Sequence, residues 1–186
     1  MIGCLPKSLE VDGVSYLIRS DFRTVLLIIQ AFNDAELSDF EKSVVCLECL
    51  YEEIPDNVEV ALEKAVWFID GGSLEKKQSQ AKVYDWEQDE SIIFSAINKV
   101  AGFETREKEY MHWWTFLGYF CEIGEGAFSS AVSIRSKIAK GKKLEKYEKD
   151  FLKENKELIT LKEKKTPEQI ADEEYDNKIL KELLGQ

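Results

Sequence analysis

The amino-acid sequence predicts a mainly α-helical fold that begins with a small β-hairpin. Residues 9–18 alternate apolar and polar side chains around Asp12-Gly13, a pair that tolerates positive φ and closes a two-residue hairpin turn. From Phe22 onward, apolar side chains recur every three or four residues, which is the spacing of one helix face. We therefore expect a hairpin and a compact domain of about six helices in residues 1–138. A charged helical extension is expected in residues 139–186.

The first two helices carry recognisable start and stop signals. Ser20 or Asp21 can cap a helix whose apolar face extends to Phe32. Residues 38–41, Ser-Asp-Phe-Glu, form the capping-box pattern, in which a hydroxyl and a carboxylate exchange bonds with backbone N–H groups. They open a second helix, which Pro55 is expected to stop.

A third helix is expected to begin near Asp56 and to end at Gly71-Gly72, where the chain must become left-handed. Residues 73–82 are polar and are expected to form an exposed linker. Asp85 is then expected to cap a fourth helix, with Gln88 three residues on. Gly102 ends that helix.

Thr105 can open a fifth helix, which carries many aromatic side chains and is apolar on most of its circumference. This pattern is typical of a central core helix. The glycines of residues 124–126 end it, and a sixth, shorter helix is expected over residues 128–138.

Beyond the sixth helix, residues 140–165 alternate Lys and Glu, which fits either a solvated helix or a partly unfolded segment. Residues 166–169, Thr-Pro-Glu-Gln, form a second capping box, with proline at the first helical position. The piece that follows is either an interaction tail or a domain element. Its weak apolar stripe consists of Ile170, Ile179, Leu180, Leu183 and Leu184.

The 186 residues carry a formal net charge of −11, which argues against nucleic acid as a partner because phosphates require clustered Lys and Arg. Residues 139–165 have ten basic side chains, but the six carboxylates of the same stretch oppose phosphate binding. No apolar run approaches the roughly 20 residues that cross a bilayer. Four cysteines and a start without a secretory signal favour reduced thiols in a cytoplasm.

Cys46 and Cys49 have the spacing of a metal or redox pair, but no second close pair completes a four-thiolate site. Both fall inside an amphipathic helix pattern, so core positions are favoured. His112 is the single histidine, and a general base would need a nucleophile and an orienting carboxylate that the sequence does not tie to it. A structural histidine at the edge of an aromatic core is favoured, and a pH-sensing role stays open.

Asp85 and Asp89 stand one helical turn apart, a spacing that suits a hard cation or an acid–base pair. Asp85 as a helix cap and Asp89 beside the positive end of the helix dipole explain both residues more simply. The sequence therefore predicts no enzyme activity, no catalytic or cofactor-binding residue, no metal site and no cofactor.

In order along the chain, these features resemble the bacteriophage gene-product-fifteen family, encoded in the tail-morphogenesis region of long-tailed phages of Gram-positive bacteria. The resemblance covers about residues 5–138, and the aspartate cluster followed by the His-Trp-Trp run is its most specific part. The motif residues that we single out as core or partner-binding positions are Asp85, Trp86, Asp89, His112, Trp113, Trp114, Phe116 and Arg135. The matching residues also include Leu5-Pro6, Gly13, Tyr16, Ile18, Asp21-Phe22-Arg23, Ile54-Pro55, Gly71-Gly72, Tyr84 and Ile134. Arg135 is expected to pair with Asp85 or Asp89 within the fold.

The resemblance implies a non-enzymatic tail assembly chaperone that binds the tape-measure protein in the host cytoplasm during virion morphogenesis. The major tail protein or a neighbouring assembly chaperone is a further implied partner. Nucleic acid and membrane are not expected as partners, and the sequence specifies no oligomeric state. Two alternatives remain: a minor structural component of the phage tail, and a hydrolase that uses Asp85, Asp89 or His112.

Overall fold

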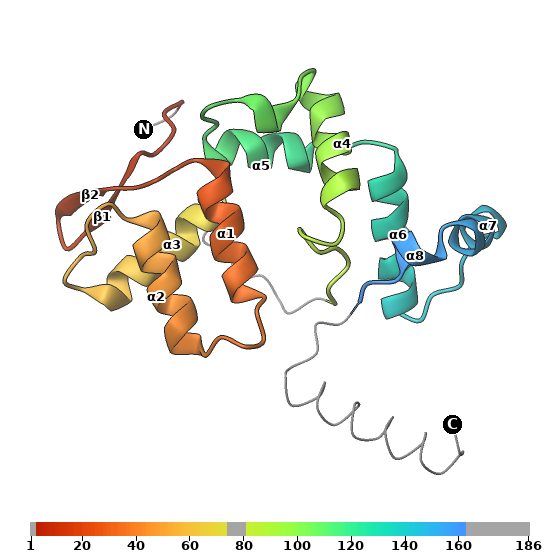
Figure 1. Cartoon of the computed structure of the whole chain (residues 1–186), viewed down its shortest axis with the longest axis horizontal. Coiled ribbons are helices and arrows are strands. Elements are labelled where there is room, and N and C mark those ends of the chain that lie inside the picture. The colour runs from red at the N-terminus through yellow and green to blue at the C-terminus, as the bar shows by residue number, and fades with distance from the viewer. Residues whose placement is uncertain (1–2, 74–80, 163–186) are drawn as a thin grey trace, which may run out of the picture.

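The structure, a computed structural model, describes residues 3–73 and 81–162. These residues form the predicted mainly helical fold with an N-terminal two-stranded hairpin. Figure 1 shows the hairpin and helices α1 to α3 at one end, α4 and α5 in the middle, and α6 to α8 at the other end. The elements are β1 (Ser8–Val11), β2 (Val14–Leu17), α1 (Phe22–Phe32), α2 (Asp39–Leu50), α3 (Val58–Ile69), α4 (Glu90–Ala101), η1 (Thr105–Glu107), α5 (Trp113–Cys121), α6 (Ala127–Ala139), α7 (Lys146–Glu154) and α8 (Lys156–Ile159).

The hairpin turn has the geometry that the sequence predicts. Strands β1 and β2 pair antiparallel, and Asp12 and Gly13 between them have φ of 50° and 81°. Two successive residues at positive φ match the right-handed twist of the strands. Leu9 and Val11 of β1 are buried, and β1 packs against α3.

The caps of α1 and α2 are confirmed, but α2 ends earlier than predicted. Asp21 accepts a bond from the backbone N–H of Arg23, and Ser38 forms the capping box with Glu41. Helix α2 ends at Leu50 rather than near Pro55. The reason is long-range: Tyr51 forms a β-bridge with Ile18, and the Arg19 guanidinium donates to the Glu48, Cys49 and Tyr51 carbonyls at the helix end.

The predicted start of the fourth helix is wrong. Asp85 accepts bonds from the backbone N–H groups of Glu87 and Gln88, at 2.9 Å each, but these residues form a turn, and α4 begins only at Glu90. Asp89 lies at the N-cap position and makes no side-chain cap bond there. Its carboxylate is engaged elsewhere, as described below.

The predicted start of the fifth helix is also wrong. Thr105 opens only a 3-10 turn, because its N–H and hydroxyl both donate to Asn98 Oδ1. The chain then runs beside the start of α1, where Phe22 N–H donates to the Met111 carbonyl and Trp113 N–H donates to the Ser20 carbonyl. Helix α5 begins at Trp113 after this pairing.

The sixth helix is confirmed as α6, and the charged segment that follows forms two short helices, α7 and α8, that contact α6. A small second core joins Ala131, Ile134 and Ile159. The described part of the extension is therefore packed rather than a fully solvated helix. The boundary after residue 138 stays a prediction. Most of the predicted linker and the predicted helix that opens at Thr166 lie outside the described residues.

The main core lies among helices α1 to α5. Phe22 and Phe116 stack with their ring centroids 4.3 Å apart. Other fully buried members of this core are Val25, Ile28, Leu50, Phe68, Ile93, Ile97 and Trp113. Burial of these large side chains is the main stabilising term of the fold.

Candidate functional site

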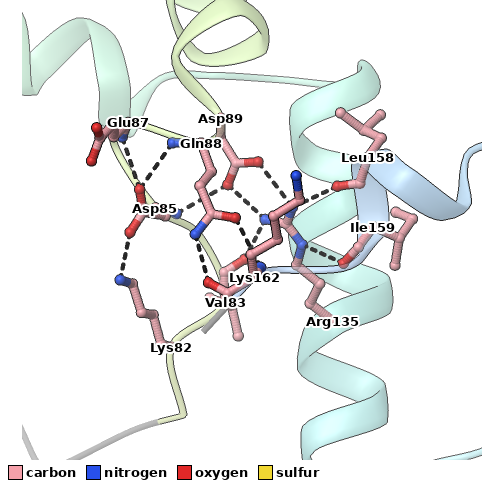
Figure 2. Close-up of polar contacts among 10 residues, drawn as sticks. All are labelled: Lys82, Val83, Asp85, Glu87, Gln88, Asp89, Arg135, Leu158, Ile159 and Lys162. Carbon is pink, nitrogen blue, oxygen red and sulfur yellow. Dashed lines mark hydrogen bonds and ion pairs between the residues drawn. The ribbon is translucent and has the colours of Figure 1, made fainter. Parts of the chain in front are cut away.

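Asp89 and Arg135 form a buried bidentate ion pair between the start of α4 and the middle of α6 (Figure 2). The guanidinium Nη1 and Nη2 lie 2.7 and 2.9 Å from the two carboxylate oxygens. Arg135 also donates to the carbonyls of Val83, Leu158 and Ile159. These five bonds match the five N–H donors of a guanidinium. The pairing predicted from sequence is therefore present, with Asp89 as the partner.

Asp85 has a different partner. One carboxylate oxygen accepts the Glu87 and Gln88 N–H groups, and the other lies 2.5 Å from Lys82 Nζ. Burial opposes ionisation of Asp85, but Lys82 and the two backbone donors outweigh it and hold the pKa of this carboxyl below its ordinary value. The Asp85 N–H in turn donates to Asp89, so the two aspartates are linked through the backbone.

Gln88 attaches the end of the described chain to this turn. Its amide nitrogen donates to the Lys162 carbonyl and its amide oxygen accepts the Lys162 N–H, at 2.8 Å each. Figure 2 shows Gln88 and Arg135 reaching the segment 158–162 from two elements. The aspartate cluster of the sequence motif therefore serves to attach α8 and the residues after it, up to Lys162, to the rest of the fold.

His112 is the N-cap of α5. Its Nδ1 accepts the backbone N–H of Trp114 at 3.0 Å, so the ring proton lies on Nε2, which donates to the Pro6 carbonyl at 2.8 Å. Burial lowers the pKa of His112, the Pro6 bond opposes that shift, and nearby Lys7 adds to it. Both ring nitrogens are therefore committed to holding the N-terminal segment and α5 together.

The two tryptophans that follow His112 close the end of α3. Trp113 Nε1 donates to the Ile69 carbonyl and Trp114 Nε1 to the Phe68 carbonyl, both at 2.8 Å. Both carbonyls lie in the last turn of α3, where the regular helix bonds end, and the Phe68 carbonyl also accepts the Gly71 N–H. A Cβ on Gly72 would lie 2.9 Å from the Trp114 ring, so the glycine at this position permits the approach.

Trp86 and Phe116 complete the set of singled-out residues. Phe116 is fully buried, and Trp86 is partly buried against it, with ring centroids 6.1 Å apart. Trp86 also packs on Phe120. The structure thus places all eight residues in or against the core, or in polar contacts that fix turns and join separate segments.

The Cys46–Cys49 pair lies on α2, one turn apart, with Cys46 fully buried and Cys49 partly buried. Burial raises the pKa of Cys46 to about 12, which opposes formation of the thiolate that redox or metal chemistry requires. Within residues 3–73 and 81–162, no group of three or more His, Cys, Asp or Glu side chains gathers in a metal-binding arrangement.

A cleft of about 710 Å³ lies between α6 and α7; we call it the α6–α7 cleft. Its α6 wall is built of small residues, which leaves room for a bound side chain. On α7, the face of Tyr147, Asp150, Phe151 and Glu154 lines the cleft, whereas the lysines of that helix do not. Tyr147 is 69% exposed. The cleft therefore offers aromatic surface beside carboxylates.

A second hollow, of about 410 Å³, separates α1 from the turn before α4; we call it the α1–α4 groove. It is mainly apolar, and Arg23, Gln30, Glu87, Glu90 and Arg106 supply its polar groups. The remaining lining residues are Phe22, Leu26, Leu27, Trp86 and Phe94.

The sequence patterns did not reveal either hollow, because each depends on how two helices pack. The exposed aromatic Tyr147 within a stretch of Lys and Glu was the one available signal for the α6–α7 cleft. Gln88 was recognised only as a capping residue, and its contact with Lys162 spans 74 positions.

Within the described residues, no helix has the length and apolar character needed to cross a bilayer. A family model described as Bacteriophage Gp15 protein matches residues 1–161. No curated protein and no solved structure matches the chain significantly.

Proposed function

Because this chain belongs to the bacteriophage Gp15 protein family, we propose that it is a tail assembly chaperone that binds the phage tape-measure protein in the host cytoplasm. In this role it acts without enzyme activity. It shields apolar stripes of the long tape-measure chain until tail-tube subunits assemble around that chain.

We place the contact with the tape-measure protein in the α6–α7 cleft. An amphipathic helix binds by placing apolar anchors in a groove, and Tyr147 and Phe151 offer apolar surface for such anchors. Glu125, Asp150 and Glu154 add carboxylates to the lining, which contains no Lys or Arg. The partner segment is therefore expected to be a helix with basic residues beside its apolar stripe.

The geometry of the motif residues supports a non-enzymatic role. A hydrolase built on Asp85, Asp89 or His112 would need these groups to meet a substrate or a water. Instead, Arg135 binds Asp89, Lys82 binds Asp85, and Pro6 and Trp114 engage the two nitrogens of His112. The Asp89–Arg135 and His112–Pro6 contacts join distant parts of the chain, and the Asp85–Lys82 and His112–Trp114 contacts fix local turns, as a structural role requires.

Co-expression with the tape-measure protein tests the proposal. The wild-type chain is expected to raise the soluble fraction of the tape-measure protein, whereas Tyr147→Ala is expected to lose most of this effect. Phe40→Ala is the matched control, because Phe40 is an aromatic residue that is 77% exposed on α2, away from the cleft. An unchanged soluble fraction with the wild-type chain would refute the chaperone role. An equal loss in both variants would refute the assignment to the cleft.

A further inference from the structure

The α1–α4 groove has the form of a receptor for a helix. Phe22, Leu26 and Gln30 lie one turn apart along α1, and Glu90 and Phe94 lie one turn apart on the facing wall. Leu27 is 57% exposed at the edge of the groove. Phe22 and Phe94 form the buried floor of the groove, whereas Leu26 and Trp86 are only partly covered by the described chain.

The described chain ends beside this groove. Lys162 is bonded through both backbone polar groups to the side chain of Gln88, whose neighbour Glu87 lines the groove. Figure 1 shows the end of the described chain next to the segment that leads into α4. Twenty-four residues follow Lys162. The first three can span at most about 10 Å, so the helix signal at Thr166 falls within reach of the groove.

The sequence of that C-terminal segment suits the groove in apolar pattern and in charge. Within its apolar stripe, Ile179, Leu180, Leu183 and Leu184 have the spacing of one helix face, and Ile170 lies off that face. Lys178 and Lys181 flank part of this stripe and can approach the carboxylates of the lining. The six acidic residues within positions 166–184 can approach the two arginines of the lining.

We propose that residues 166–184 dock as an amphipathic helix in the α1–α4 groove of the same chain. Leucine and isoleucine side chains of the segment cover Leu26, Leu27 and Trp86, and the bonds between Gln88 and Lys162 fix the point from which the segment starts. The inference rests on the groove and the chain path, and it is independent of the tape-measure protein. Docking in the same molecule also keeps this apolar surface from a second copy.

Hydrogen exchange of the full chain, followed by mass spectrometry at two protein concentrations tenfold apart, tests the docking. Amides of residues 166–184 are expected to exchange at least about tenfold more slowly than in the free peptide of the same sequence. Leu27→Asp, in the groove, is expected to remove this protection. Leu183→Asp, in the docking segment, is expected to remove it as well. Leu17→Asp is the matched control, because Leu17 is 58% exposed on β2 and does not line the groove.

Protection that is equal at both concentrations, lost in Leu27→Asp and kept in Leu17→Asp supports the proposal. Exchange at free-peptide rates in the wild-type chain would overturn it, and so would protection that Leu27→Asp leaves unchanged. Protection that appears only at the higher concentration would assign the groove to a second copy and would overturn docking within one chain. Circular dichroism of each variant establishes that the helical domain is intact.

Discussion

Replacing Arg135 by methionine probes the contact that holds α6, the Asp85–Asp89 turn and α8 together. The change leaves Asp89 buried without its counter-charge, and breaking a buried pair in this way costs about 3–5 kcal/mol of folding free energy. For a chain of this size, each kcal/mol lowers Tm by about 2–4 °C, so a fall of roughly 6–20 °C is expected. Urea denaturation followed by circular dichroism and tryptophan fluorescence measures the loss.

Arg106→Met is the matched control, because Arg106 pairs with Glu104 at a site where the arginine side chain is 49% exposed. An exposed pair contributes about 1 kcal/mol or less. Equal losses in the two variants would refute the reasoning that burial makes the Asp89–Arg135 pair critical. The double variant Arg135→Met with Asp89→Leu removes the unpaired charge and is expected to be more stable than Arg135→Met alone. Its remaining loss of stability reports the three backbone carbonyls that lose Arg135 as donor and the Asp85 N–H that loses Asp89 as acceptor.

Three further changes test other parts of the structure. Because burial lowers the pKa of His112, the unfolded chain binds the extra proton more readily, so the free energy of unfolding should fall as pH drops below 6.5. His112→Asn keeps an acceptor for the helix cap and should flatten this part of the pH profile, as measured by urea titrations. Gly72→Ala meets an indole ring at 2.9 Å and should cost more than about 2 kcal/mol, whereas Gly13→Ala meets no atom within 4 Å and should cost about 1 kcal/mol, both measured by urea denaturation. Buried Cys46, with a pKa of about 12, should react with a thiol reagent at least about tenfold more slowly than exposed Cys121, as mass spectrometry of the labelled protein will show.

The features that sequence predicted well are those with local causes. The Asp12-Gly13 turn, the capping box at Ser38 and the left-handed end of α3 at Gly71-Gly72 each depend on residues close together in the chain. Such signals act through backbone conformation or short-range hydrogen bonds, so the printed sequence contains them. The family resemblance rested on several of these positions and is confirmed by the family match.

The features that sequence missed have distant causes. Helix α5 begins late because residues before Trp113 pair with the start of α1, about 90 positions earlier. Arg135 pairs with Asp89 and donates to carbonyls from two other segments, whereas Asp85 pairs with Lys82, and the sequence patterns specify none of these partners. The two hollows depend on packing between helices, which no spacing rule describes.

Co-purification of the chain with its tape-measure protein, followed by a search for the chain in finished tails, tests the proposed function most directly. The chaperone role predicts that a tag on either protein retains the other and that purified tails lack the chain. Retention in purified tails would instead make the protein a structural component of the tail. Failure of the two proteins to associate would contradict the proposed function outright.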